Sequence, residues 1–582
     1  MTHGTIDSLI GGPALQVHGE SEAHGARRPA LIGILCAGAI SAFALLGGSG
    51  DDRFPYPENE EIHLGVARVS FLAGGVSISR GDDPRVWRNA AVNTPVITGD
   101  RLYSGKAGRF ELELQGGNLV DMGPRSELSV LNLVEGATQL AVRSGVASFS
   151  LRRVLEDEVF EVDTPAAAVT LQQAGEYRIE AAAGAGASML AVIRRGMAMV
   201  AAGGGELSVG TGHQVRIEGN EKPQYDFGAA GAPDAWDGWV EERRRRFREI
   251  RSSALVNSEV VGVADLDQAG RWENTPDYGN AWTPSNVEKD WQPYRNGRWL
   301  WQDPWGWTWV SEEPWGWAPY HYGRWAAYPA GWFWVPVSPT ARYVAYSPAL
   351  VAFLGGGADG SAAQGFRAGG DVGWFPLALQ DPFYPWWIPR LGVHLTRVTE
   401  FVYRNRRKIT VVPSKAFASG ELVRANLVRD EAVLLDALDG PVLRIPLPLP
   451  PTQDSLHVAA RSQAGRNERP SAAILTQPIV ARATPPRGPP TFGAKLEAIR
   501  QNRGAPVPPS VAIRIRQAGG RDAAAGPAVI PVVRPDGRMT LAPRHPDTTT
   551  PLPQPIKPAA GPPPFRAPAP NATSGSSRRS LR

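Results

Sequence analysis

The sequence lacks the residues and short motifs on which most enzyme chemistry depends. Its 582 residues include a single cysteine, Cys36, which excludes an internal disulfide framework and a multi-cysteine zinc site. There is no Gly-x-x-x-x-Gly-Lys-Ser/Thr phosphate loop, no His-Glu-x-x-His and no Gly-x-Ser-x-Gly, and the nine histidines show no metal-ligand spacing. We therefore expect no enzyme: no catalytic residue, no metal site and no cofactor is assigned.

Long hydrophobic runs are also scarce. One uncharged run of 17 residues, 30–46, follows two arginines and precedes two aspartates. Its length is at the short end of a membrane-spanning helix, and cations before it with anions after it favour a cytoplasmic N-terminus. We expect residues 29–47 to be a signal anchor, with 1–28 in the cytoplasm and all later residues outside. A cleaved signal peptide is the alternative, and the protein would then be secreted or periplasmic.

Residues 62–220 alternate apolar and polar side chains in short runs separated by Gly, Asn and Asp, which is typical of a β-sandwich or a rolled β-sheet. The segments that carry a family resemblance are Gly65–Val69, Thr98–Leu102, Phe110–Leu114, Ser126–Leu128, Phe160–Pro165 and Gly175–Arg178, followed by Gly196, Gly212 and Gln214. In these segments the chain resembles FecR-type domains. The resemblance implies an extracytoplasmic β domain and, in the founding type, a cytoplasmic N-terminal segment that passes an envelope signal to a sigma factor.

A helix is predicted over residues 234–254, on the C-terminal side of the β domain. Trp236, Val240, Phe247 and Ile250 fall on one stripe of helical period, and Asp234 is placed to cap the helix. The helix also contains four consecutive arginines, at 243–246, with acidic residues nearby. We interpret this run as a solvated helix face, so no nucleic-acid partner is expected.

The abundant residue is tryptophan, and its spacing is regular. Of the 19 tryptophans, 15 lie between Trp282 and Trp387, and the tripeptide Gly-Arg-Trp begins at 270, 297 and 323. A repeat of this length indicates a repeated structural unit, and tryptophans two residues apart lie on one face of a strand. We therefore predict a domain of Trp-rich β-hairpins over residues 255–420.

Two roles are open for these aromatic side chains. The indoles can stack on one another as a core, since isolated hairpins are only marginally stable, or they can form an exposed surface for a glycan or a Pro-rich peptide. The candidate binding aromatics are Trp305, Trp307, Trp315, Trp317, Tyr320, Tyr322, Trp332 and Trp334. Arg271, Arg298 and Arg324 are candidate cation–π clamps on neighbouring indoles.

The same Trp-rich stretch resembles a known family. The resemblance rests on 291–299, 309–325 and 373–377, with further matching residues from about 235 to 417. This Trp-rich family occurs in exported bacterial proteins and has no assigned activity. The resemblance therefore implies an exported protein and gives no mechanism.

The C-terminal part has few aromatic residues. Residues 441–582 contain no Trp, no Tyr and two Phe, and their net charge is +14, whereas the preceding 440 residues carry −10. Such a Pro-rich, basic segment cannot bury enough apolar surface to offset the entropy of ordering it. We expect 441–582 to be disordered.

Together these features predict a mainly β protein. Its parts are a FecR-like β-sandwich or rolled sheet, a Trp-rich β-hairpin repeat module, one connecting helix, an N-terminal transmembrane helix and a disordered Pro-rich tail. We expect a non-catalytic protein of the bacterial inner membrane and cell envelope that scaffolds or binds a glycan, peptidoglycan or an envelope protein. The alternative is a transmembrane signal regulator of the FecR/anti-sigma type, although residues 1–28 are short and Gly-rich for that role. A sigma-factor partner is implied only by this alternative.

Overall fold

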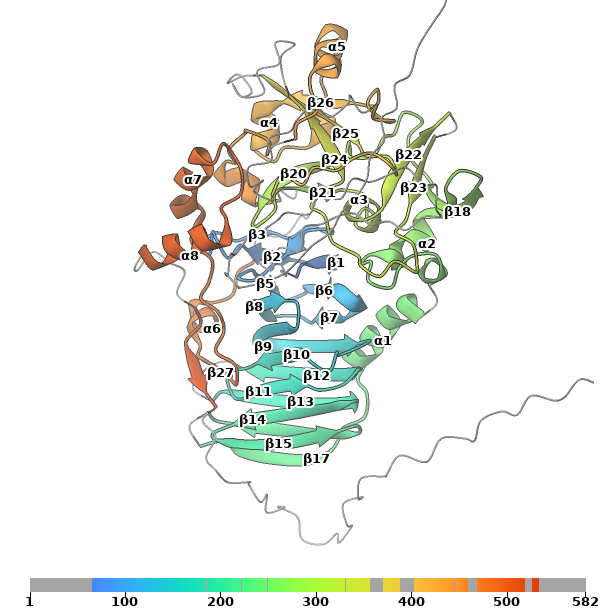
Figure 1. The fold of residues 1–582 in the computed structure, drawn as a ribbon. Helices are drawn as coiled ribbons and strands as arrows, with labels where there is room; N and C mark the ends of the chain where they lie inside the picture. The colour runs from blue at the N-terminus through green and yellow to red at the C-terminus, as the bar shows by residue number, and fades with distance from the viewer. Residues whose placement is uncertain are drawn as a thin grey trace, which may run out of the picture. The chain divides into compact units, whose positions relative to one another are not determined.

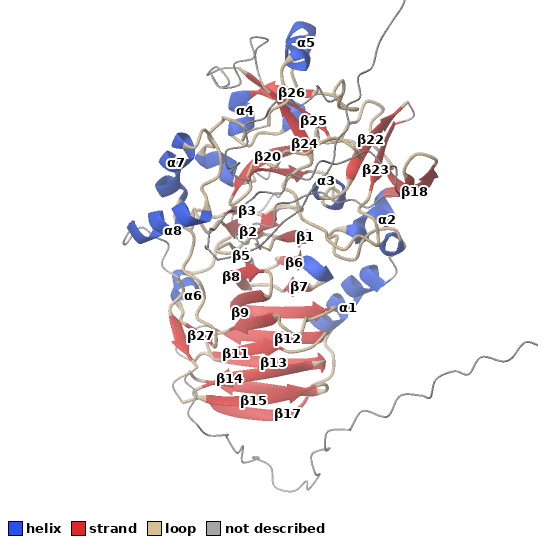
Figure 2. Cartoon of the chain, viewed as in Figure 1, coloured by secondary structure: helices blue, strands red, loops and turns tan. Residues whose placement is uncertain are grey.

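The computed structural model describes residues 65–532, apart from 183, 185, 221, 249, 330, 356–369, 388–401, 445, 459–467 and 519–525. The expected cytoplasmic segment 1–28 and membrane segment 29–47 lie outside the described residues, as does 533–582. No helix in the described ranges is both long enough and apolar enough to span a membrane. Strands dominate the described part, as predicted (Figure 2).

The first domain, here called the N-terminal domain, is built from strands alone. Its strands are β1 (Ala67–Ala73), β2 (Val76–Ser79), β3 (Arg88–Asn89), β4 (Pro95–Val96), β5 (Arg101–Ser104), β6 (Arg109–Glu113), β7 (Leu119–Met122), β8 (Glu127–Val134), β9 (Ala137–Leu151), β10 (Val159–Asp163), β11 (Ala168–Leu171), β12 (Gly175–Ala182), β13 (Ser188–Arg195), β14 (Met197–Ala202), β15 (Gly205–Gly210), β16 (His213–Glu218) and β17 (Gln224–Ala229). β17 extends the domain beyond the boundary expected at residue 220.

These strands form two layers that share one long strand, β9. One layer has the order β3-β2-β5-β8-β9-β10-β11-β14-β15. The other has the order β4-β1-β6-β7-β9-β12-β13-β16-β17, and the lower strands of both layers are stacked in Figure 1. Only the β9–β10 pairing is parallel among these. A core of buried Val, Leu, Ile, Ala and Phe side chains fills the space between the layers.

β9 passes from one layer to the other at Gly145. Residues up to Ser144 pair with β8, and residues from Gly145 onward pair with β12. Gly145 has φ +89°, and a Cβ atom there would lie 2.0 Å from the Ser126 hydroxyl oxygen. Only glycine combines this backbone conformation with this close approach, so the crossover depends on that residue.

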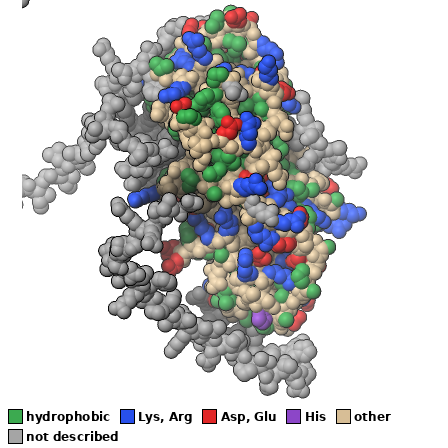
Figure 3. Space-filling view, turned by 90° about the vertical axis from the view of Figure 1, so that its right-hand side faces the viewer, with side chains coloured by type: hydrophobic (Ala, Val, Ile, Leu, Met, Phe, Trp, Pro, Cys, Tyr) green, Lys and Arg blue, Asp and Glu red, His purple; other side chains and the backbone are tan. Residues whose placement is uncertain are grey.

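Helix α1 (Ala235–Arg248) comes after the strands, within the range predicted. The Asp234 carboxylate accepts hydrogen bonds from the backbone amides of Trp236 (2.9 Å) and Asp237 (3.1 Å), so the expected cap is present. The prediction of a solvated arginine face is wrong for Arg243 and Arg244, because both are buried against the N-terminal domain. On the face shown in Figure 3, basic and acidic side chains are interspersed.

The second domain, here called the tryptophan domain (residues 255–440), consists of three small sheets and short helices. Its elements are α2 (Leu266–Ala269), β18 (Gly270–Thr275), β19 (Gly279–Pro284), β20 (Gly297–Gln302), β21 (Gly306–Ser311), α3 (Ala318–His321), β22 (Arg324–Tyr328), β23 (Gly331–Val335), β24 (Val351–Leu354), β25 (Asp371–Pro376), β26 (Thr410–Pro413), α4 (Ser414–Ala418) and α5 (Glu431–Asp439). The sheets are β18-β19-β23-β22, β20-β21 and β24-β25-β26.

Each Gly-Arg-Trp tripeptide begins a hairpin, as the repeat predicted. The three hairpins are β18–β19, β20–β21 and β22–β23. A Cβ atom on the repeat glycine would lie 2.4 Å from Trp282 in the first hairpin, 2.5 Å from Trp309 in the second and 2.7 Å from Trp334 in the third. The repeat therefore places a glycine beneath an indole of the partner strand, which lets the two strands and the indole pack closely.

Residues 441–532, here called the C-terminal segment, are folded where they are described, and the expectation of disorder is wrong for them. Their elements are α6 (Ala472–Thr476), β27 (Ile479–Ala481), α7 (Phe492–Gln501), α8 (Pro509–Ala518) and β28 (Val529–Pro531). Phe492 and Ile499 of α7 are at most 2% exposed and belong to the core of the tryptophan domain. Val480 bridges to Thr164 of the N-terminal domain. The segment needs no core of its own, because its few apolar side chains join cores that other residues build.

Candidate functional site

The eight candidate binding aromatics lie in the interior. None of them is more than 7% exposed, and all belong to one core cluster. Trp301 and Trp307 meet edge to face at 5.4 Å across β20–β21, and Trp315 stacks on Tyr320 at 5.9 Å. This corrects the idea of an exposed binding row: the indole-bearing faces of neighbouring hairpins pack against one another instead of facing solvent.

The three candidate clamp arginines do not lie over indoles in the contacts that the structure describes. Arg298 pairs with Glu312 at 2.8 Å, and Arg271 pairs with Glu273 at 2.7 Å near the surface. Arg324 lies over the ring of Phe383, with its guanidinium carbon 5.8 Å from the ring centre. The expectation is corrected, since carboxylates and a phenyl ring take the places given to indoles.

A buried ion cluster joins the N-terminal domain to the tryptophan domain. Arg68 of β1 is 1% exposed and pairs with Glu113 of β6 (3.4 Å) and with Asp265. The backbone amide of Gly262 donates to Glu113 at 3.0 Å. Burial raises the pKa of Glu113 to about 7, although Arg68 opposes this shift. The charge of this carboxyl is therefore balanced near neutral pH.

A second buried cluster fastens α1 to the same domain. Arg243 donates two hydrogen bonds, at 3.0 and 2.8 Å, to the Glu111 carboxylate, and Arg244 pairs with Asp121. Arg243 also lies 4.1 Å above the ring of Phe71. Burial opposes ionisation of Glu111, but Arg243 outweighs it and lowers the pKa of that carboxyl. A bidentate guanidinium–carboxylate pair of this kind holds the helix in a defined orientation.

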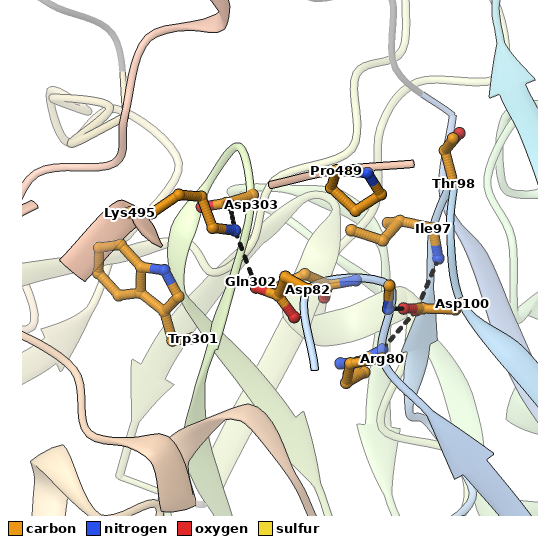
Figure 4. Close-up of a pocket in the computed structure, with 11 residues that line it drawn as sticks. Arg80, Asp82, Ile97, Thr98, Asp100, Trp301, Gln302, Asp303, Pro489 and Lys495 are labelled. Atoms are coloured by element: carbon orange, nitrogen blue, oxygen red, sulfur yellow. Dashed lines mark hydrogen bonds and ion pairs between the residues drawn. The ribbon is translucent and has the colours of Figure 1, made fainter. Parts of the chain in front are cut away.

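The C-terminal segment contributes a buried lysine to the junction of both domains. Lys495 of α7 is 1% exposed, and its ammonium pairs with Asp82 (2.9 Å) of the N-terminal domain and with Asp303 of the tryptophan domain. Figure 4 shows the lysine between these groups, beside the Arg80–Asp100 ion pair (2.7 Å). Burial alone would lower the pKa of Lys495, but the two aspartates raise it, so the lysine is charged.

The cavity around Lys495 is small. It holds about 20 Å³, which is room for about one water molecule. The indole nitrogen of Trp301 and both amide atoms of Gln302 are buried there with no hydrogen-bond partner among the described residues. Within the described ranges, no group of three or more His, Cys, Asp or Glu is arranged to hold a metal ion. The chemistry at this junction is therefore that of a structural clasp.

Sequence reasoning missed all three junction contacts. Lys495 lies 413 residues from Asp82 and 192 residues from Asp303, and Arg68 lies 197 residues from Asp265. No local spacing or motif joins residues so far apart. The available signal was weaker: a lysine on the apolar stripe of a helix, next to residues such as Ile499.

Comparison with family models matches two parts of this chain. Residues 100–217 match the family described as FecR protein, and residues 263–381 match a family of unknown function (DUF6600). The chain is therefore a FecR-domain protein, as the resemblance in its β segments predicted. The Trp-rich part is a DUF6600 domain, and that description assigns it no activity.

Two solved structures are similar to part of the chain. Both are described as a "putative anti-sigma factor" from Parabacteroides distasonis ATCC 8503, with 16% and 15% sequence identity and TM-scores of 0.20 and 0.21. The matches cover 23% and 24% of this chain and 60% and 64% of those chains, so this chain spans less than two thirds of their length. No curated protein matches the sequence.

Proposed function

We propose that this protein is a non-catalytic signal regulator of the FecR type in the bacterial cell envelope. The observation that carries the proposal is the FecR match over residues 100–217, inside a domain built entirely of strands. FecR-type domains imply reception of a signal outside the cytoplasm and its transmission to a sigma factor inside. The arginines before residues 30–46 and the aspartates after them support the required orientation.

The buried ion clusters support a receiving unit made of both domains. Arg68 contacts Asp265, and Lys495 contacts both Asp82 and Asp303, so three separate parts of the chain meet at desolvated charges. Separating such pairs leaves unpaired buried charges, which is costly. The domains therefore move together, and a ligand or partner that acts on the tryptophan domain also acts on the FecR domain.

Scaffolding, the first interpretation of the sequence, makes the opposite prediction about the cytoplasm. A scaffold needs no partner there, whereas a regulator needs residues 1–28 to contact a sigma factor. The FecR match favours the regulator. We assign no enzyme activity to either interpretation.

Two measurements test the proposal. Protease added to intact spheroplasts should degrade the body of the protein, and complete protection would contradict the orientation. In a bacterial two-hybrid assay, residues 1–28 should bind a sigma factor of the host, with a scrambled 28-residue sequence as the matched control. Deletion of the gene should change transcription from promoters of that sigma factor. If neither the binding nor the transcriptional change occurs, the regulator is refuted and the scaffold remains.

A further inference from the structure

A second cavity, of about 360 Å³, lies between the FecR domain and the tryptophan domain. Its FecR-domain wall comes from the turn after β6, the β8–β9 hairpin and the loop after β9. Its other wall comes from Glu259, Trp305, Tyr322 and the segment 342–346. Its volume lies in the range of small-molecule sites, about 300–1,000 Å³. A ligand here would contact both domains at once.

One wall of this cavity is aromatic and fixed by packing. Trp305, Tyr322 and Tyr346 are each at most 8% exposed. Tyr346 meets Trp305 at 5.2 Å and Tyr322 at 6.3 Å, both edge to face, and it stacks on Trp317 at 5.6 Å. Tyr343, which also lines the cavity, is 70% exposed. The cavity thus has rigid rings in its interior and one accessible ring.

The hydroxyl of Tyr346 is a buried polar group without a hydrogen-bond partner among the described residues. A buried hydroxyl left unpaired costs about 1–3 kcal/mol, so such a group in a folded protein needs an explanation. Burial raises the pKa of Tyr346, which keeps the hydroxyl protonated and able to donate. An oxygen atom of a ligand in the cavity is a suitable acceptor.

The opposite wall is polar and carries charges of both signs. Arg153 of the FecR domain and Glu259 pair through two hydrogen bonds of 2.6 Å, so this pair spans the two domains. Glu135, Glu158 and Arg342 also line the cavity. An anionic ligand would meet three carboxylates, and a purely apolar ligand would desolvate the charges without pairing them. Hydroxyl groups, which both donate and accept, suit such a wall.

We propose that this cavity binds a neutral saccharide of one or two rings. The sugar places its apolar C–H face against the aromatic wall, its oxygen accepts from the Tyr346 hydroxyl, and its other hydroxyls bond the Arg153–Glu259 pair. The inference rests on the proposed function only for its biological meaning, since the bound saccharide would be the envelope signal that the regulator receives.

Calorimetric titration of the full chain, in a detergent without a sugar headgroup, tests the proposal. The probes are cellobiose and N,N′-diacetylchitobiose, with digalacturonate as the anionic control. At least one neutral disaccharide should bind in the millimolar range or tighter, and digalacturonate should not. Absence of binding by both neutral probes, or equal binding of digalacturonate, would overturn the proposal.

Removal of one hydroxyl separates binding from folding. Tyr346→Phe should weaken binding of the neutral probe about tenfold, the size expected for one hydrogen bond, with no loss of melting temperature. The matched control is Tyr225→Phe, because the Tyr225 hydroxyl bonds the Ala202 carbonyl (2.6 Å) in the FecR sheet and does not line the cavity. Unchanged affinity of Tyr346→Phe would refute the site. Neither titration involves residues 1–28, so failure here leaves the sigma-factor test independent.

Discussion

Replacement of Lys495 by methionine should release the C-terminal segment from both domains. The ammonium is buried and pairs with Asp82 and Asp303, while the methylene chain packs at the edge of the core. Methionine keeps most of the apolar volume, so the variant removes chiefly the charge. Breaking a buried ion pair by removing one partner costs about 3–5 kcal/mol. The aspartate side chains keep 14% and 24% of their exposure and can regain water, so we expect the lower end, about 3 kcal/mol.

Urea unfolding followed by tryptophan fluorescence, combined with hydrogen exchange of α7, measures this loss. The matched control is Arg500→Met on the same helix, since Arg500 is exposed and pairs with Glu497 only at 4.0 Å; its effect should stay below about 0.5 kcal/mol. Adding Asp82→Asn and Asp303→Asn to the lysine variant should restore part of the stability, because no unpaired charge remains. If Lys495→Met and Arg500→Met behave alike, the clasp does not exist.

Three further predictions concern the packing and the buried titratable groups. Gly297→Ala should cost about 1–3 kcal/mol in thermal unfolding, because its Cβ would lie 2.5 Å from Trp309, whereas Gly238→Ala in α1, with no atom nearby, should be neutral or stabilising. Burial lowers the pKa of His321 to about 3, so wild type should lose stability relative to His321→Gln as the pH falls from about 6.5 towards 3, by up to about 1.4 kcal/mol per pH unit. Glu113 has the opposite sign: its pKa is raised to about 7, so wild type should lose stability relative to Glu113→Gln as the pH rises from about 4.5 to 7. Unfolding curves for each pair that stay parallel across these pH ranges would contradict the assigned burial.

The hairpins of the tryptophan domain were predictable because their signal is local. A glycine, an arginine and a tryptophan recur at 270, 297 and 323, and indoles two residues apart share a strand face. The same holds for the FecR strands, where alternation and glycine-containing turns lie within a few residues of each other. What alternation does not indicate is the object that covers a given face. Trp307 and Trp317 therefore suited a core and a binding surface equally well.

The C-terminal segment shows the limit of compositional reasoning. Its low aromatic content correctly indicates that it cannot build a core alone. Phe492 and Ile499 nevertheless become buried, because the tryptophan domain already provides most of the apolar surface around them. A segment that adds a few side chains to an existing core loses its ordering entropy against contacts that composition does not count.

Periodicity and motif spacing by themselves determined that this protein is mainly β, where its two domains lie, and that each repeat forms a hairpin. Only the tertiary structure decided that the indoles face inward, that Arg243 and Arg244 meet carboxylates of the FecR domain, and that Lys495 joins three distant parts of the chain. Local patterns depend on backbone geometry within a few residues, whereas burial and ion pairing depend on which surfaces meet. Those surfaces are brought together by contacts up to 413 residues apart in the sequence.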